Sequence, residues 1–170
     1  MNIYLTSGTR DFMESLQKRF EQDKMIIMYG AKNTVLMHET DGKTRFQTPR
    51  KYEVVASYGT LQKEGFFAFN HIPVTDDGKP IFEHRLQNRA DSISAEPGLI
   101  AFRFLRPKDS DTYIVFTQWT EKKDLERWKK SPNYAYIHID DESGAGLHKG
   151  PHIFNSAPYL ATYVSKEEGE

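Results

Sequence analysis

The sequence has no cysteine among its 170 residues. Disulfides, thiolate-bound zinc, iron–sulfur clusters and a cysteine nucleophile are therefore excluded. Long apolar runs are also missing, because stretches such as Met25–Met28 and Leu99–Phe102 fall far short of the ~20 residues that span a bilayer. The first ten residues combine no basic start with an apolar stretch, so no secretory signal is visible. We expect a cytoplasmic protein that does not associate with a membrane.

An excess of positive charge is absent as well. The chain has 23 basic and 24 acidic residues and a formal net charge of −1. Binding to nucleic acid needs a basic face, so we expect no nucleic-acid partner. Residues 65–69 look superficially like the aromatic strand of an RNA-recognition motif, but Glu64 stands where a basic residue belongs. The sequence also has no serine-hydrolase elbow, phosphate-binding loop or dinucleotide-binding turn.

Aromatic residues, by contrast, are plentiful: 11 Phe, 9 Tyr and 2 Trp. They suffice for a sizeable core, or for a pocket that holds a flat apolar ligand. The length fits one domain or two small fused halves.

Hydrophobic periodicity predicts two successive βαββα passes. The first pass has strands at 2–5, 25–29 and 34–39, a helix at 10–20, and a short second helix that carries Tyr52, Val55 and Tyr58. The second pass has strands at 66–74, 99–105 and 112–119 and helices at 80–94 and 121–130. Ser131-Pro132 restarts that last helix to about residue 139, a long loop covers 140–156, and a final strand covers 157–165.

One βαββα unit exposes a sheet face that its own helices cannot cover, and two units packed sheet to sheet bury that face. We therefore expect an α+β fold of two ferredoxin-like halves fused in one chain, with their sheets packed face to face. The division falls at residues 1–63 and 64–170. Because the fusion already supplies the dimer-like contact, we expect a monomer.

Asn70 and the histidines are the candidate polar site residues. Asn70 interrupts an apolar strand, and either a bulge or backbone group satisfies its amide or the NH₂ donates to a ligand in a pocket. Alternation places His71 on the opposite face of that strand. His138 follows Trp128 by ten positions, and the spacing alone favours a histidine at a helix end beside a core tryptophan. His38 and His84 are expected on the surface. His148 and His152 are spaced like a metal-binding pair, but the intervening Gly150-Pro151 argues against the helix this needs.

The second half resembles the antibiotic biosynthesis monooxygenase (ABM) superfamily, and within it the IsdG-type haem-degrading monooxygenases. The stretches that carry this resemblance are Phe69-Asn70-His71-Ile72, Glu96-Pro97-Gly98, residues 101–107, Thr117-Gln118-Trp119-Thr120 and residues 127–131, ending at His138. Asn70, Trp128 and His138 match the family's catalytic set one for one. Over the whole chain, the resemblance is to a long, two-half member of the family.

This resemblance implies haem as both cofactor and substrate, opened with O₂ and an external electron donor, with release of iron. His138 would be the axial ligand of the haem iron, Asn70 a hydrogen-bond donor on the opposite side, and Trp128 a residue that presses on the porphyrin face. Apolar residues available to line the slot are Phe69, Phe102, Phe104 and Trp119. The first half has Leu5-Thr6 where the Asn would be needed, so we expect one haem per chain and a purely structural first half.

Two other functions compete with this hypothesis. One is a cofactor-independent oxygenase that acts on an aromatic substrate, which would not need a histidine at position 138. The other is a non-enzymatic haem-binding or signal-transduction regulator, which would bind haem without consuming it.

Overall fold

The computed structural model describes residues 1–138 and 153–166. Its elements follow one another in this order: β1 (Asn2–Gly8), α1 (Arg10–Arg19), a short 3₁₀ turn (Glu21–Asp23), β2 (Ile26–Tyr29), β3 (Thr34–Thr40), β4 (Arg50–Tyr58), β5 (Phe66–Pro73), α2 (Lys79–Ser94), β6 (Leu99–Pro107), β7 (Thr112–Trp119), α3 (Lys122–Lys129), α4 (Pro132–Ile137) and β8 (Tyr159–Val164). None of the helices within this part of the chain is both long and apolar enough to cross a membrane.

The strands form one closed antiparallel barrel in the order β1-β3-β2-β8-β5-β7-β6-β4. The first four strands of the sequence are neighbours in the order β4-β1-β3-β2, and the last four in the order β8-β5-β7-β6. Both are the strand order of a ferredoxin-like sheet. The halves join where β4 pairs with β6 and β2 pairs with β8. The predicted α+β fold of two fused ferredoxin-like halves is therefore confirmed.

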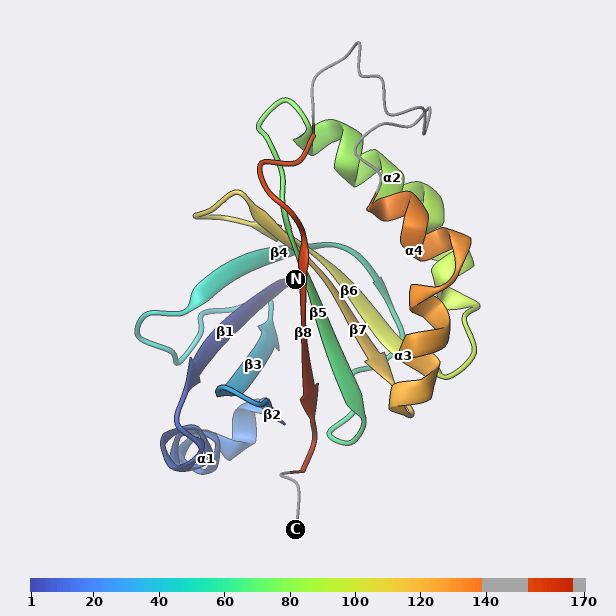
Figure 1. Ribbon diagram of the computed structural model, residues 1–170. Helices are drawn as coiled ribbons and strands as arrows, with labels where there is room; N and C mark the ends of the chain where they lie inside the picture. The colour runs from blue at the N-terminus through green and yellow to red at the C-terminus, as the bar shows by residue number, and fades with distance from the viewer. Residues whose placement is uncertain (139–152, 167–170) are drawn as a thin grey trace.

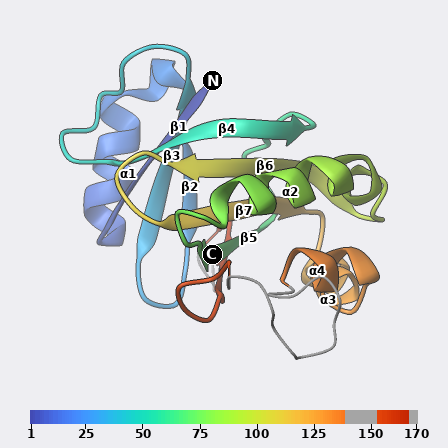
Figure 2. The ribbon, with the colours of Figure 1, turned by 90° about the horizontal axis from the view of Figure 1, so that it is seen from above.

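Three apolar clusters occupy the two sides of the barrel wall. The cluster inside the barrel takes residues from both halves, among them Ile3, Met28, Phe67 and Phe116, so the two sheets pack face to face. A second cluster lies between the first half and α1, which covers that side (Figure 1). The third and most aromatic cluster lies between the second half and α2, α3 and α4, which together cover the opposite side (Figures 1 and 2).

Strand β5 contributes to two of these clusters, because alternate residues of a strand point to opposite faces. Phe67 and Phe69 point into the barrel, whereas Ala68 and Ile72 point toward the helices. The face that Asn70 shares with Ala68 and Ile72 is thus the face under α3 and α4.

The short helix predicted through Tyr52 and Val55 is wrong, since these residues belong to β4. A bulge between Val54 and Ala56 is the physical reason. Tyr52 and Val54 pack on the barrel interior, while Val55 and Ala56 both pack toward the helix side. The bulge breaks the two-residue alternation and leaves apolar residues at a three-residue spacing that imitates a helix.

The expected surface position is confirmed for His84 and wrong for His38. His84 is exposed on α2, whereas His38 is only 5% exposed. The rings of Tyr4 and Phe46 flank His38, and its Nδ1 atom lies 3.3 Å from Thr44 Oγ1. Burial lowers the pKa of His38, so the imidazole is neutral at pH 7. The segment after β3 folds back over this strand and covers His38. The pattern of residues within the strand does not predict this contact.

We predict that the protein is a monomer in solution. In this barrel β4 of the first half pairs along most of its length with β6 of the second, and β2 meets β8 at one residue pair, so the long edges of β4 and β6 are not available to a second copy. Light scattering at micromolar concentration should give the mass of one chain, 19.7 kDa. A stable mass of twice that value would contradict the prediction.

Candidate active site

The three candidate catalytic residues come from β5, α3 and the end of α4. Asn70 lies in the middle of β5 and is 1% exposed, and Trp128 on α3 is fully buried. His138 is the C-cap residue of α4 and is partly exposed. Trp128 belongs to the cluster that α2, α3 and α4 make with the sheet, and Tyr134, which packs against this cluster, contacts Asn70, Trp128 and His138.

Local sequence signals fix the position of α3. A capping box begins the helix, in which the Asp124 carboxylate accepts a hydrogen bond from the Glu121 backbone N–H at 3.1 Å. Gly98 lies directly against Asp124: its φ is +82°, and a Cβ there would lie 2.1 Å from Asp124 Cγ. Only glycine combines this backbone conformation with this approach. This contact holds the start of α3 against the turn before β6. It thereby fixes the helix that carries the buried Trp128.

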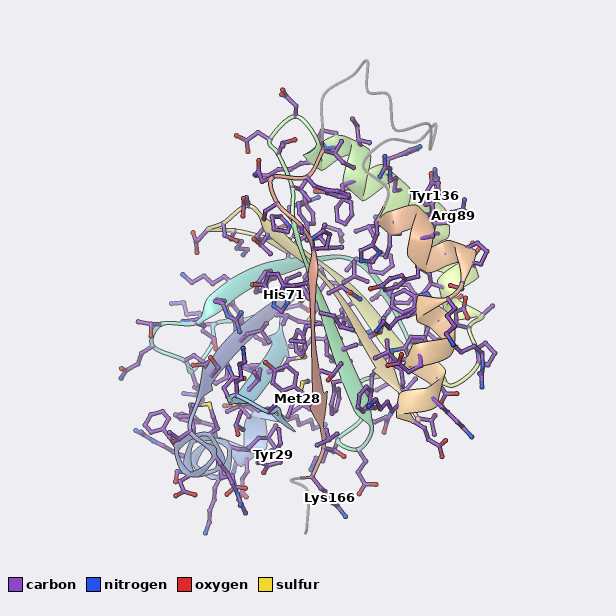
Figure 3. The ribbon with its side chains drawn as sticks, viewed as in Figure 1. Met28, Tyr29, His71, Arg89, Tyr136 and Lys166 are labelled. Atoms are coloured by element: carbon purple, nitrogen blue, oxygen red, sulfur yellow. The ribbon has the colours of Figure 1, made fainter. Side chains whose placement is uncertain are left out.

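The break between α3 and α4 turns the chain so that Trp128 and His138 both contact the ring of Tyr134. Ser131 caps α4, and its Oγ accepts a hydrogen bond from the Tyr134 N–H at 3.3 Å. Pro132 occupies the first position of the helix, where no N–H is needed. On the far side of α4, the guanidinium of Arg89 lies 3.9 Å from the centre of the Tyr136 ring and ties α4 to α2 (Figure 3).

Tyr134 lies at the centre of the site and connects the three candidates. Its ring stacks on His138 at 4.1 Å between centroids and meets Trp128 edge to face at 4.9 Å. Its hydroxyl lies 3.3 Å from Asn70 Oδ1, with the phenol donating and the amide oxygen accepting. We did not single out Tyr134 from the sequence. The signal that could have found it is its position four residues before His138, on the same face of a helix.

One buried polar atom on each of the three candidates has no hydrogen-bond partner among the described residues. These atoms are Asn70 Nδ2, Trp128 Nε1 and His138 Nε2. Burying a polar group without a partner costs about 1–3 kcal/mol, so three in one place are unusual for a region that serves stability alone. Two of these atoms are N–H donors, and the third is a ring nitrogen whose protonation the neighbouring hydrogen bond decides.

That hydrogen bond leaves His138 Nε2 as an acceptor. His138 Nδ1 lies 2.8 Å from the carbonyl oxygen of Tyr134, and a carbonyl can only accept, so Nδ1 carries the proton. Burial lowers the pKa of His138, with a smaller opposing effect from the Tyr134 backbone, and the ring is neutral at pH 7. A neutral imidazole with one nitrogen held by a carbonyl and the other free is the usual arrangement of a histidine that binds a metal.

The predicted lining residues separate into two groups. Phe102, Phe104 and Trp119 belong to the same cluster as Trp128, and the Trp119 ring lies 5.5 Å from that of Trp128. Phe69 does not join them, because alternation along β5 places its ring in the barrel interior, on the opposite face from Asn70. Its inclusion in the slot is therefore corrected.

His148 and His152, the pair with metal-binding spacing, lie outside the described residues. Within residues 1–138 and 153–166, no group of three or more His, Asp or Glu side chains gathers to hold a metal ion. A single histidine as an iron ligand needs no such group.

Comparison with known proteins finds a family similarity within the second half. Residues 65–138 match the sequence profile of the antibiotic biosynthesis monooxygenase family. The matched segment begins at β5 and ends at His138, so it contains Asn70 and Trp128 as well.

Relatives match a longer part of the chain at low identity. A heme-degrading monooxygenase of Listeria monocytogenes is 24% identical over 130 residues, which cover 76% of this chain and 78% of that protein. A signal transduction protein, TRAP, of Staphylococcus aureus is 26% identical over 129 residues, which cover 76% of this chain and 77% of that protein. The solved structure of a major regulator of staphylococcal pathogenesis has a TM-score of 0.86 at 22% identity and covers 98% of this chain and 100% of its own, so the fold is shared over the full length.

Proposed function

Because residues 65–138 match the antibiotic biosynthesis monooxygenase family, we propose that the chain belongs to this superfamily and is a haem-degrading monooxygenase. The observation that carries this proposal is His138, a neutral, partly buried imidazole whose Nδ1 donates to the Tyr134 carbonyl and whose buried Nε2 has no partner among the described residues. When bound, haem would supply the iron chemistry that activates O₂ toward the porphyrin itself, with electrons from an external donor, so that it is substrate as well as cofactor.

The residues around His138 fit a flat apolar substrate of this kind. His138 Nε2 would bind the iron, and the stacked Tyr134 ring and the Tyr134 carbonyl hold the imidazole in a fixed orientation. The Tyr134 hydroxyl fixes Asn70 Oδ1 and leaves the Nδ2 group as a free donor. Trp128 offers an indole N–H on a fully buried ring. Phe102, Phe104 and Trp119 add apolar surface.

The proposal includes one haem per chain, bound by the second half. In the first half, the β1 segment aligned with β5 by its place in the ferredoxin-like order has Leu5-Thr6 where Asn would be required. That half also has a single α-helix among the described residues, so it has no counterpart of α3 and α4 to carry a Trp and a His.

A haemin titration followed in the Soret region tests the function directly. We expect saturation at one haem per chain, followed by loss of the Soret band and release of chelatable iron when ascorbate is added in air. Saturation at two haems would contradict the assignment to one half. Binding without consumption would make the protein a haem-binding regulator, the function to which the similarity with the staphylococcal signal transduction protein points.

We predict that Asn70→Ala keeps haem binding but slows its degradation. The variant removes one buried donor, a loss of about 1–3 kcal/mol, which corresponds to roughly 5- to 160-fold in rate if that donor acts during the reaction. The rate of Soret decay under ascorbate measures this, and Asn88→Ala on the exposed side of α2 is the matched control.

Tyr134→Phe separates a direct role of Asn70 from an indirect one. It keeps the Asn70 amide and removes the hydroxyl that orients it. We expect a smaller loss of rate than in Asn70→Ala. An unchanged rate in Asn70→Ala would remove Asn70 from the reaction.

A further inference from the structure

The barrel has a cavity on the opposite face of β5 from Asn70. Its volume is about 500 Å³, within the usual range of small-ligand sites. It lies beside the β2–β3 turn and β8, and the residues that line it include Asn33, Arg50, His71, Tyr159 and Tyr163. An eight-stranded barrel has an interior that side chains either fill or leave open for one small ligand.

The cavity lies where the two halves of the barrel share few strand contacts, between β2 and β8. Strands β2 and β8 share a single residue pair, Tyr29 with Val164. Beyond that pair, the β2–β3 turn at residues 30–33 runs beside β8 in place of a strand. Gly30 lets the Tyr163 ring approach, since a Cβ there would lie 2.5 Å from Tyr163 Cε2. The Tyr163 hydroxyl donates to Asn33 Oδ1 at 3.0 Å, so this wall is held in place.

The inner wall is aromatic and contains one buried ring nitrogen without a hydrogen-bond partner among the described residues. His71 is 8% exposed, and its Nδ1 atom has no hydrogen-bond partner among the described residues. Its ring stacks in parallel on Tyr159 at 4.4 Å, and Phe69 and Tyr163 continue the aromatic surface. Figure 3 shows His71 among the strands, apart from α2 and α4. Burial lowers the pKa of His71 to about 4, and the positive charge of Arg50 adds to this effect. Hydrogen bonds with the backbone of Phe69 and Tyr159 oppose it more weakly.

The charged side chains that line the cavity are all positive. Lys32 and Arg50 line it at its exposed rim, and among the described residues no Asp or Glu does. A ligand with an anionic group at the rim, a flat apolar body against the aromatic wall and a polar group at His71 would satisfy all three regions.

We propose that this cavity binds a small aromatic carboxylate that carries a hydroxyl group, with the carboxylate at Arg50 and Lys32 and the hydroxyl at His71. The site is separate from the proposed haem site, because His71 and Asn70 point to opposite faces of β5. The proposal therefore holds or fails independently of haem degradation.

Binding of 4-hydroxybenzoate to the haem-free full chain, followed by amide NMR shifts, tests the proposal. We expect saturable shifts at residues 30–33 and in β8. Neutral 4-hydroxybenzamide, which lacks only the charge, should bind at least about tenfold more weakly. The variant His138→Ala should bind 4-hydroxybenzoate like the wild type.

Two substitutions assign the contacts. Arg50 is exposed, so Arg50→Gln does not endanger folding. This variant should weaken the binding of 4-hydroxybenzoate at least about tenfold and leave the affinity for 4-hydroxybenzamide unchanged. His71→Phe keeps a ring against Tyr159 and removes both nitrogens, so it should abolish the preference for 4-hydroxybenzoate over benzoate. Absence of saturation up to about 10 mM, equal binding of acid and amide, or an unchanged affinity in Arg50→Gln would each overturn the proposal.

Discussion

His138→Ala is expected to lose specific haem binding, with no sharp Soret band and no iron release under ascorbate. The imidazole is the one iron ligand in the proposed site, and its removal leaves only apolar and stacking contacts to hold haem. We expect affinity to fall by at least about 100-fold, since loss of a coordinate bond and of a pre-oriented ligand exceeds the ~2.7 kcal/mol that this factor represents. A Soret titration of both proteins measures the difference.

His84→Ala is the matched control for this variant. His84 lies on the exposed side of α2 and is the same residue type in the same half of the chain. It should titrate with haemin like the wild type. The folding of His138→Ala, measured by circular dichroism, should also match, because the ring is only partly buried and caps the end of a short helix. Undiminished haem binding in His138→Ala would rule out this residue as the ligand.

Trp128→Ala is expected to destabilise the haem-free protein by about 3–5 kcal/mol, the usual cost of emptying a buried tryptophan site. The Trp128 ring is fully buried and contacts both Trp119 and Tyr134, so two aromatic contacts in the cluster between the second half and its helices depend on it. Urea unfolding measures this loss. Because it is a large fraction of the stability of a typical domain, the alanine variant is not informative about activity.

Trp128→Phe separates packing from chemistry. It keeps an aromatic ring and removes an indole N–H that has no partner among the described residues, so no hydrogen bond is lost. Trp119→Phe changes the same volume but breaks the hydrogen bond from Trp119 Nε1 to Thr117 Oγ1 at 2.8 Å. We expect Trp119→Phe to be the less stable of the two by about 1 kcal/mol. Equal stability would mean that the Trp128 N–H is satisfied in the haem-free protein.

The sequence predicted the second half well because its signals are local. Ser131-Pro132 marks the break between α3 and α4, and Gly98 marks the turn before β6, so each boundary depends on residues within a few positions. Asn70 and Trp128 were identified by resemblance, and the structure adds what the resemblance lacks: Tyr134, which contacts both of them and His138.

The errors at β4 and at His38 involve contacts with other segments of the chain. The bulge in β4 forms where this strand pairs with β6, about fifty residues later in the chain. His38 is buried by Phe46 and Tyr4 together. Phe69 was assigned to the wrong side of the sheet, although the alternation that separates it from Asn70 was available in the sequence. The cavity at His71 depends on the seam between β2 and β8, which no periodicity within either strand can reveal.

The position of β8 has a consequence for how the protein folds. This strand follows all the others in the sequence, yet it lies between β2 and β5 in the closed sheet. Until it inserts, two strand edges that belong to different halves remain open, and open edges recruit other chains. Contacts between segments so far apart in the sequence form slowly. Closure of the barrel is therefore the step at which a nascent chain is most exposed to aggregation, and a chain truncated before Tyr159 should depend on chaperones to stay in solution.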